Sequence, residues 1–225
     1  MKIAGIEKNS FVDYPRHLSC VVFTQGCNMN CFYCHNKPLI GNGEIRNISC
    51  KEVLDFLLKR QKFIDAVVIS GGEPTMQTDL EDFIKDVKKM SFKVKLDTNG
   101  TNPKVIENLI SKELIDYVAM DIKAPFNRYE EFCGVKTDIN CIKESIGILM
   151  EGNVDYEFRT TLAIGLGLAD ILDICKEIKG AKSYILQRCR AFDGGVSNPI
   201  SITDVIKVIG KMVRNVDTRG IEISA

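Results

Sequence analysis

Three cysteines near the start of the chain have a spacing that suits a metal centre. Cys27, Cys31 and Cys34 form a C-x3-C-x2-C run. Thiolates are soft ligands, and proteins use them to hold zinc or iron–sulfur clusters. A structural zinc site is closed by four ligands, and a 4Fe–4S cluster is normally held by four thiolates. With three thiolates, one iron would lack a protein ligand and stay open to a substrate.

A closed zinc site is the alternative for this cysteine run. Either His35 or Cys20 could act as a fourth ligand beside the three thiolates. Spacing alone leaves both kinds of centre open, so the rest of the chain has to decide between them. A lone histidine is more often a packing or hydrogen-bonding residue than a ligand, and we do not assign His35 to iron.

Each further unusual segment follows a predicted strand. In parallel α/β folds, ligands collect at the carboxyl ends of the strands. One site built from six strand ends therefore explains the arrangement better than six unrelated features. The segments are the cysteine loop, Gly-Gly-Glu-Pro at 71–74, Asp-Thr-Asn-Gly at 97–100, Asp-Ile-Lys at 121–123, Arg159, and Gln187 with Arg188.

Taken singly, these segments have simpler structural explanations. Gly71 and Gly72 could form only a tight turn ahead of a proline. Asn99 followed by glycine is a frequent turn pair. Asp121 and Lys123 could be an exposed ion pair, which would add little stability. The case for a site depends on their common position rather than on any one of them.

Apolar runs alternate with helical patterns about six times along the chain. This alternation predicts a parallel sheet with right-handed crossovers. Six units fall short of the eight that close a barrel, so we expect a partial, open (β/α)6 barrel, with a doubly wound sheet as the alternative. Strands are predicted at 18–24, 66–70, 92–96, 117–122, 154–162, 183–187 and 220–224. Helices are predicted at 50–62, 79–90, 103–111, 138–150, 169–179 and 203–213.

The first two predicted helices each have one apolar face. Ser49 is the expected N-cap of the first. The residues expected to face the core are Val53, Leu54, Leu57 and Leu58 in the first helix, and Leu80, Phe83, Ile84 and Val87 in the second.

The composition is that of an ordinary globular chain. Thirty basic residues balance 30 acidic ones among 225, so nothing indicates nucleic acid or an anionic membrane as a partner. No apolar run reaches the ~20 residues that cross a bilayer, and the N-terminus has no apolar signal region. We expect one domain over residues 1–225, located in the cytoplasm. Nine cysteines would be reduced there, which favours a metal or catalytic role over disulfides.

Together, the motifs resemble those of the radical S-adenosylmethionine (SAM) superfamily. The cysteine run is followed by His35-Asn36, then by Gly-Gly-Glu-Pro, Asp-Thr-Asn-Gly and Asp-x-Lys in that order. This set is similar to that of the activating enzymes of glycyl-radical enzymes. Segments 3–6, 11–15, 158–161 and 186–188 make the chain most similar to the type that activates anaerobic ribonucleoside-triphosphate reductase.

The resemblance implies two cofactors, one 4Fe–4S cluster and SAM. Cys27, Cys31 and Cys34 would bind three irons, and the open iron would bind the amino and carboxylate groups of SAM. One electron from the reduced cluster would then break a carbon–sulfur bond, giving methionine and a 5′-deoxyadenosyl radical. No residue is assigned to the chemical step itself. The implied cofactor-binding residues are Tyr33, Asn36, Gly71, Gly72, Glu73, Asp97, Asn99, Asp121, Lys123, Arg159 and Gln187.

The same resemblance suggests roles for most of these residues. Tyr33 would contact the adenine. The residues implied for the methionine amino group are Gly71, Gly72 and Glu73. Those implied for the ribose and carboxylate are Asn36, Asp121, Lys123 and Arg159. A monovalent cation is also implied, surrounded by Asp97, Thr98 and Asp121.

The resemblance further implies a protein substrate. The target would be a glycine Cα–H of a glycyl-radical enzyme, and we expect anaerobic ribonucleotide reductase. Only a short segment separates Cys34 from Ser49, so we expect a single cluster and an external flavodoxin or ferredoxin as electron donor. Two alternatives remain: a radical SAM enzyme that acts on a small molecule, and a zinc-binding interaction module without catalysis.

Overall fold

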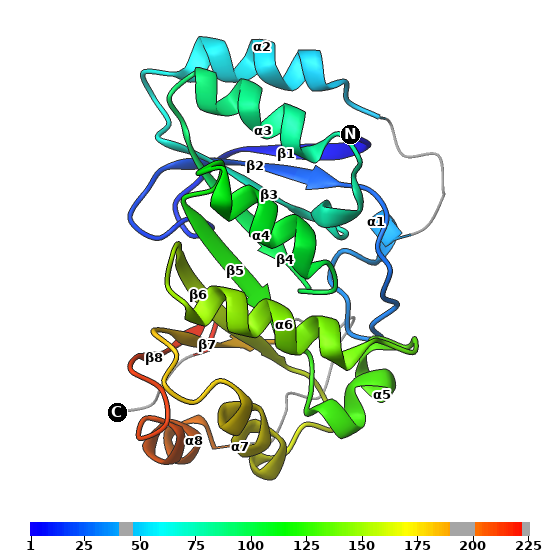
Figure 1. Ribbon diagram of the computed structural model, residues 1–225, viewed down its shortest axis with the longest axis vertical. Coiled ribbons are helices and arrows are strands. Elements are labelled where there is room, and N and C mark those ends of the chain that lie inside the picture. The colour runs from blue at the N-terminus through cyan, green and yellow to red at the C-terminus, as the bar shows by residue number, and fades with distance from the viewer. Residues whose placement is uncertain (41–46, 190–200, 222–225) are drawn as a thin grey trace.

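The computed structural model describes residues 1–40, 47–189 and 201–221. Its strands form one eight-stranded sheet in which each strand pairs with its neighbours in chain order (Figure 1). The first pair is antiparallel and every later pair is parallel. The strands are β1 (Ile3–Ser10), β2 (Ser19–Thr24), β3 (Ala66–Gly71), β4 (Lys93–Thr98), β5 (Tyr117–Asp121), β6 (Asp155–Leu162), β7 (Tyr184–Arg188) and β8 (Val216–Arg219).

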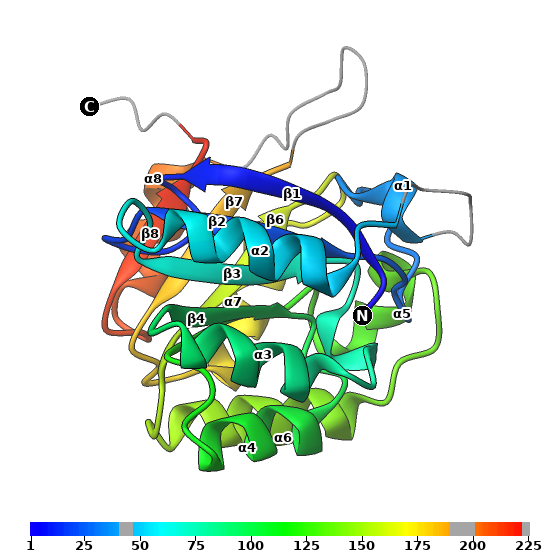
Figure 2. The same ribbon diagram turned by 90° about the horizontal axis from the view of Figure 1, so that it is seen from above.

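Helices follow each of the strands β2 to β7 and lie around the outside of the curved sheet (Figures 1 and 2). They are α1 (Lys37–Ile40), α2 (Cys50–Arg60), α3 (Leu80–Lys89), α4 (Pro103–Ser111), α5 (Tyr129–Cys133), α6 (Ile139–Met150), α7 (Leu168–Glu177) and α8 (Ile202–Ile209), with 3-10 turns η1 (Pro74–Met76) and η2 (Phe126–Arg128). In the described part of the chain no pairing joins β1 to β8, so the sheet is open. The predicted partial (β/α)6 barrel is confirmed. The doubly wound alternative is wrong, because it requires a reversal of strand order.

Four helices and strands differ from the sequence prediction, among them α1, whose four residues are too few to show a helical period. Strand β1 was not predicted, because most of its side chains are exposed or only partly buried and form no apolar run. Helix α5 has five residues, too few to show a helical period. The last strand was expected at 220–224, but β8 lies at Val216–Arg219, and residues 222–225 lie outside the described residues.

The cap predicted for α2 is confirmed. Ser49 Oγ accepts a hydrogen bond from Glu52 N (3.2 Å), and a Glu52 carboxylate oxygen accepts one from Ser49 N (2.8 Å). This capping box satisfies two free backbone donors. Val53 and Leu57 are buried as predicted, whereas Leu58 is 56% exposed, so that part of the prediction is wrong. All four core residues predicted for α3 are buried.

The sheet is buried on both faces, as parallel sheets are. Val67 and Ile69 of β3 belong to the main core beneath the helices. Ala66 and Val68, which alternate with them, pack with Tyr14 in a smaller apolar cluster inside the barrel. Further along the strands the inner face becomes charged, and this charged end is where the sequence motifs lie.

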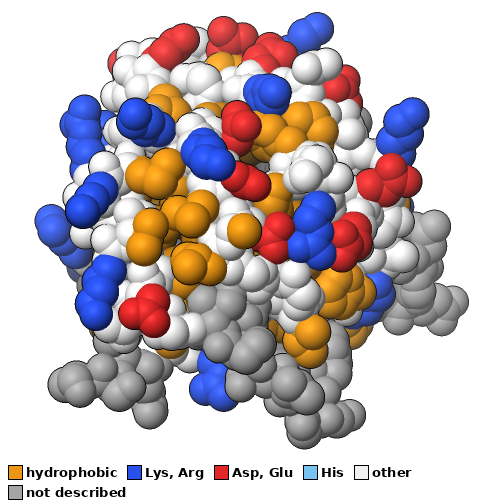
Figure 3. Space-filling view, turned by 90° about the horizontal axis from the view of Figure 1, so that it is seen from below, with side chains coloured by type: hydrophobic (Ala, Val, Ile, Leu, Met, Phe, Trp, Pro, Cys, Tyr) orange, Lys and Arg blue, Asp and Glu red, His pale blue; other side chains and the backbone are white. Residues whose placement is uncertain are grey.

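The outer surface over α7 and α8 mixes apolar and charged side chains (Figure 3). Leu168 of α7 is 39% exposed and Val208 of α8 is 42% exposed. Within the described residues, no helix is both long enough and apolar enough to cross a bilayer.

Candidate active site at the carboxyl edge of the sheet

The cysteine loop begins directly after β2 and is tied to its neighbours by backbone hydrogen bonds. Gly26 N donates to Leu39 O of α1 (2.8 Å), and Gly26 O accepts from Glu73 N (2.8 Å). Gly26 has a φ of +92°, which glycine adopts without strain. The loop is therefore fixed both to α1 and to the segment that follows β3.

The Lys123 ammonium acts on the thiols of all three cysteines of the loop. The pKa of Cys31 is lowered by a hydrogen bond with the Cys133 thiol and, less strongly, by Lys123. Burial raises the pKa of Cys27 to about 11 and also raises that of Cys34, and Lys123 opposes both shifts. A positive charge beside three thiols favours the thiolate forms that bind metals.

Neither residue considered as a fourth zinc ligand completes a converging ligand set with the three cysteines in the described part of the chain. His35 lines a small hollow with Ala4 and Phe23. Cys20 is buried in the main core, where burial raises its pKa to about 12. Within residues 1–40, 47–189 and 201–221, no three His, Cys, Asp or Glu side chains converge as the ligands of a single ion do. The irons of a cluster occupy separate corners, so its thiolates need not converge on one point.

A fourth cysteine, Cys133 at the end of α5, lies beside Cys31. The two thiols are hydrogen-bonded, and Asn30 N donates to Cys133 O (2.8 Å). Gly134 follows with a φ of +66°, and a Cβ there would lie 2.6 Å from Asn30 O. Helix α5 therefore packs closely against the cysteine loop, a neighbourhood that sequence spacing does not reveal.

Two glycines after β3 allow two backbone segments to approach each other closely. A Cβ on Gly72 would lie 2.0 Å from Gly26 O. A Cβ on Gly71, whose φ is +110°, would lie 2.5 Å from Thr24 N. The pair therefore does more than form a tight turn, because it lets this segment pack against the cysteine loop. Contact of Gly71 or Gly72 with SAM stays a prediction.

We expect Gly72→Ala to displace the cysteine loop, since its Cβ would overlap the Gly26 carbonyl oxygen. The variant should lose about 1–3 kcal/mol of unfolding free energy and hold less iron after reconstitution. Gly147→Ala is the matched control, because a Cβ there meets nothing within 4 Å on an exposed face of α6. That control should be neutral or stabilising by up to about 1 kcal/mol. Denaturant unfolding and iron analysis check both variants, and equal iron in both would contradict the structural role of Gly72.

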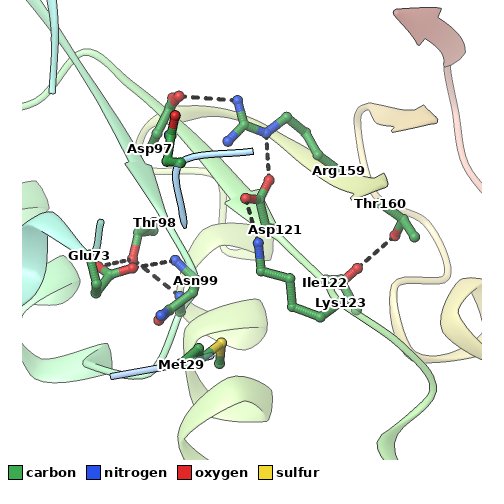
Figure 4. Close-up of polar contacts among 12 residues, drawn as sticks. Met29, Glu73, Asp97, Thr98, Asn99, Asp121, Ile122, Lys123, Arg159 and Thr160 are labelled. Atoms are coloured by element: carbon green, nitrogen blue, oxygen red, sulfur yellow. Dashed lines mark hydrogen bonds and ion pairs between the residues drawn. The ribbon is translucent and has the colours of Figure 1, made fainter. Parts of the chain in front are cut away.

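Glu73 joins the segment after β3 to the segment after β4. Its buried carboxylate accepts hydrogen bonds from Thr98 Oγ1 (2.7 Å) and Asn99 N (2.7 Å) (Figure 4). It also accepts one from Thr75 Oγ1 (2.5 Å). Burial raises the pKa of Glu73, and these hydrogen bonds oppose the shift. Because both oxygens have protein partners, Glu73 holds two loops together. Its predicted contact with the methionine amino group stays a prediction.

Asn99 lies next to the first cysteine. Its Nδ2 donates to Asn28 Oδ1 (2.9 Å) and is 3.9 Å from Cys27 Sγ. The turn expected at this position is present, since Gly100 has a φ of +76°. N–H groups near cluster sulfurs tune the reduction potential, so the Asn99 side chain is placed to act on a cluster at Cys27.

Five charged side chains form one continuous ion-pair network inside the barrel. Arg159 binds both Asp97 (Nη1–Oδ2, 3.2 Å) and Asp121 (Nε–Oδ1, 2.7 Å) (Figure 4). Lys123 Nζ lies 2.9 Å from Asp121 Oδ2, and Lys95 Nζ lies 2.6 Å from Asp97 Oδ1. The Asp121–Lys123 pair is mostly buried, with side chains 24% and 18% exposed. The exposed pair considered from the sequence is therefore wrong.

The network keeps its two carboxylates ionised at neutral pH. Burial alone would raise the pKa of Asp97 and of Asp121, but Arg159 and the neighbouring lysines hold both below their usual values. Burial lowers the pKa of Lys95, and Asp97 opposes that shift. Burial also lowers the pKa of Lys123, but the combined attraction of Asp121, Tyr33 and Cys31 outweighs burial and raises this pKa well above its usual value.

Three further predicted residues lie around this site. The Tyr33 ring packs against Phe132, and its hydroxyl is buried without a hydrogen-bond partner within the described structure. An unpaired buried hydroxyl is costly, so this donor is available to a ligand. Asn36 Nδ2 donates to Gly71 O (3.2 Å). Gln187 is partly exposed near the end of β7. The SAM contacts expected of these three residues stay predictions.

Comparison with known proteins decides the family. The sequence model of the Radical SAM superfamily matches residues 21–178, which is more than half of the chain. The chain belongs to this superfamily. Members carry a 4Fe–4S cluster and use SAM, and the three thiols on one loop beside Lys123 fit such a cluster. Membership removes the zinc-binding module as an interpretation.

Two curated relatives of this radical SAM enzyme are named as activating enzymes. It is 42% identical over 195 residues to a Methanocaldococcus jannaschii protein named "Putative glycyl-radical enzyme activating enzyme MJ1227", and the match covers 83% of this chain and 79% of that protein. It is 30% identical over 130 residues to the pyruvate formate-lyase 1-activating enzyme of Escherichia coli (strain K12), covering 54% of this chain and 52% of that one.

A solved structure shows the same fold. The crystal structure of Streptococcus suis SuiB superposes with a TM-score of 0.67 over 90% of this chain and 49% of that one, at 15% identity. This radical SAM enzyme thus spans about half the length of SuiB and of the Escherichia coli activase. At such low identity, the likeness to SuiB shows the fold alone.

The sequence interpretation of this radical SAM enzyme missed Lys95 and Cys133. A signal for Lys95 was available, because residues two apart in a strand face the same side. Lys93, Lys95 and Asp97 therefore share one face of β4, and a lysine among them can enter the barrel. Cys133 carries no comparable signal, because its link to Cys31 spans two distant segments of the chain.

One segment used for the resemblance lies away from the site. Tyr14, within segment 11–15, lines a polar hollow of about 930 Å³ with His17, Lys93 and Asp155. Lys93 and Asp155 begin β4 and β6, so this hollow lies at the amino ends of the strands. It is therefore separate from the carboxyl edge of the sheet.

Proposed function

We propose that this enzyme installs a glycyl radical on a partner enzyme, and that the partner is anaerobic ribonucleoside-triphosphate reductase. When bound, the reduced cluster supplies the one electron that breaks a carbon–sulfur bond of SAM, giving methionine and a 5′-deoxyadenosyl radical. A hydrogen atom would then pass from the glycine Cα of the partner to the deoxyadenosyl carbon, which would yield 5′-deoxyadenosine and leave the unpaired electron on the glycine. The observation that carries the proposal is the 42% identity to a protein named as an activating enzyme, across 79% of its length.

In this proposal, residues 1–225 act as one domain and Cys27, Cys31 and Cys34 hold a single cluster. The cysteine loop is fixed by its backbone bonds at Gly26, which would keep the three sulfurs in place. Lys123 would offset the negative charge of the thiolates. These residues supply no reactive group themselves. They would bind and orient the cluster and screen its negative charge.

SAM would lie between the cysteine loop and the charged network. The unpaired Tyr33 hydroxyl is the donor available to it. Arg159 already binds two carboxylates, so we propose that it orients Asp121 toward the ribose rather than binding the SAM carboxylate alone. Lys123, next to both Asp121 and the cysteines, is better placed for that carboxylate.

A protein substrate would reach the site along its exposed apolar rim. Phe32, which follows Cys31 in the loop, is 53% exposed, and Ile164 after β6 is 52% exposed. Gly165 lies near the Phe132 ring, and Phe32 packs on the same ring (5.7 Å), so the two apolar positions lie on one rim. Exposed apolar groups beside a reactive centre favour a docking partner.

The proposal also places the enzyme in the cytoplasm with an external flavodoxin or ferredoxin as electron donor. The second candidate function is action on a small molecule, since one fold hosts many reactions. A small-molecule enzyme would close its ligand pocket with its C-terminal segment. Positions 222–225 lie outside the described residues, so this distinction is left to experiment.

The test is to mix the reconstituted protein anaerobically with anaerobic ribonucleoside-triphosphate reductase, SAM and a reductant. We expect a glycyl doublet in the electron paramagnetic resonance spectrum of the reductase, and cleavage of its chain at the radical glycine after exposure to oxygen. A reductase whose radical glycine is replaced by alanine is the control, and it should show neither signal.

The outcome that contradicts the proposal is equally defined. If 5′-deoxyadenosine accumulates while no glycyl-radical enzyme of the host shows a doublet or oxygen cleavage, the substrate is a small molecule. If another glycyl-radical enzyme gives the doublet and the reductase does not, the activity stands and the named partner is wrong.

A further inference from the structure

We propose that the Lys95 ammonium group takes the place of the monovalent metal cation that the resemblance implies. This enzyme would then bind SAM without sodium or potassium. The inference concerns the SAM site that family membership establishes. It does not depend on which partner receives the radical. The inference can therefore be wrong while the proposed function is right, and the proposed function can be wrong while the inference is right.

Lys95 lies inside the barrel beside Asp97, one of the three residues expected around the cation. It is on β4, two residues before Asp97, and its side chain is fully buried. Its Nζ is 2.6 Å from Asp97 Oδ1 and 6.0 Å from the centre of the Tyr117 ring. A buried ammonium group needs a charged or polar partner, and Asp97 is that partner.

The oxygens that would bind a cation at Asp97 already have donors. Oδ1 accepts from Lys95 Nζ. Oδ2 accepts from Ser70 Oγ (3.1 Å) and from Arg159 Nη1 (3.2 Å). A metal ion at this carboxylate would have to share Oδ1 with the Lys95 ammonium or displace a donor from Oδ2.

The other two residues implied for the cation are committed in the same way. Asp121 Oδ1 accepts from Arg159 Nε (2.7 Å), and Oδ2 accepts from Lys123 Nζ (2.9 Å). The Thr98 hydroxyl donates to Glu73 (2.7 Å) and accepts from Gly100 N (3.1 Å). The expected cation site at Asp97, Thr98 and Asp121 therefore does not fit a metal ion.

The charge balance of the network leads to the same conclusion. Lys95, Arg159 and Lys123 carry three positive charges against the two carboxylates of Asp97 and Asp121. The five side chains together are therefore net positive by one charge. Buried Glu157 also acts on Lys95 and Arg159, but its ion pair with Arg219 leaves this balance unchanged. A metal cation entering this group would meet repulsion, whereas an anionic group of SAM would be attracted.

The difference between an ammonium group and a metal ion can be measured. The Lys95 amino group is part of the chain whatever salt is present, while a metal ion must be drawn from solution. If binding of a cation were coupled to binding of SAM, the cation would raise the affinity of the enzyme for SAM, commonly by about 5- to 150-fold. SAM would raise the affinity for the cation by the same factor. If Lys95 supplies the charge, adding sodium or potassium should change the affinity for SAM by a factor close to one.

The experiment measures the Kd of SAM for the reconstituted enzyme in potassium, sodium and tetramethylammonium chloride at equal ionic strength. The readout is the SAM-dependent change in the electron paramagnetic resonance spectrum of the reduced cluster, together with the melting temperature. We expect the three Kd values to agree within about twofold, below the range of coupled sites. A Kd at least about tenfold tighter in potassium or sodium than in tetramethylammonium would overturn the inference.

A variant pair makes the test sharper. Lys95→Met removes the ammonium and leaves Asp97 open, so SAM binding should become at least about fivefold weaker in tetramethylammonium and recover in potassium or sodium. Lys93→Met is the matched control, because Lys93 is exposed on the same strand, and it should behave as wild type. If the Lys95→Met variant folds and its Kd for SAM equals the wild-type value in all three salts, the inference is wrong. If Lys95→Met does not fold, the wild-type salt comparison still decides.

Discussion

Replacing any one of Cys27, Cys31 or Cys34 by alanine is expected to reduce SAM cleavage to background and to remove most of the bound iron. The loop has three thiolates, and each would bind one iron of the cluster. Replacing one removes a ligand for which the loop has no substitute. Iron and sulfide analysis, visible absorption and 5′-deoxyadenosine formation measure the loss. This is the largest effect that a single substitution should have on activity.

Two other cysteines are the controls for this prediction. Cys175, buried in α7, should tolerate alanine with full iron content and a loss on the order of 1 kcal/mol in unfolding free energy. Cys133 is the more demanding control, because its thiol is hydrogen-bonded to Cys31. If Cys133→Ala loses as much iron as Cys31→Ala, four thiolates hold the cluster and the open-iron interpretation is wrong.

Arg159→Ala is expected to cause the largest loss of stability. Arg159 is the shared partner of Asp97 and Asp121, and its own side chain is only 10% exposed. Removing one member of a buried ion pair leaves a charge uncompensated, which costs about 3–5 kcal/mol. For a chain of this length, that loss corresponds to a melting temperature lower by roughly 6–20 °C. Scanning calorimetry or thermal circular dichroism measures it.

The loss should depend on pH in a defined direction. The folded pKa values of Asp97 and Asp121 lie below their usual values. Their contribution to stability is therefore present above the unfolded pKa of about 3.9 and is lost as pH falls through the folded values. Without Arg159, burial would raise both pKa values, so the variant should begin to unfold in acid at a higher pH than wild type.

Arg214→Ala is the matched control for Arg159→Ala. Arg214 is exposed, and among the described residues no ion pair with its side chain is found. Its replacement should change the free energy of unfolding by less than about 0.5 kcal/mol. If Arg159→Ala were as stable as Arg214→Ala, with an unchanged acid transition, the ion network would contribute nothing measurable to the fold.

Much of the fold follows from local sequence patterns. The apolar runs and helical spacings place β2 to β7 and the six longer helices within a few residues. Each of these strands buries a continuous apolar run, and each helix buries apolar residues spaced along one face. The Ser49 cap is equally local, since its bonds join residues three apart. The patterns fail where an element is mostly exposed or very short, as in β1 and α5, or where a strand faces a charged interior, as in β8.

The candidate site divides in the same way. The sequence identifies Cys27, Cys31, Cys34 and the residues at the strand ends, since their spacing and position are local properties. It does not show which partner each side chain takes. Arg159 and Asp121, which were expected at SAM, also bind each other, and the Glu73 carboxylate also accepts hydrogen bonds from the neighbouring loop.

The sequence by itself determined the class of chemistry, because the cysteine spacing and the order of the motifs can be recognised without knowing the fold. Only the tertiary structure decided how the charges pair. Lys95, Asp97, Asp121 and Arg159 come from three different strands, and a buried charge takes whichever opposite charge the sheet register brings within reach. That register depends on the packing of the whole barrel, so the pairing of Arg159 with both Asp97 and Asp121 appears only once the strands lie side by side.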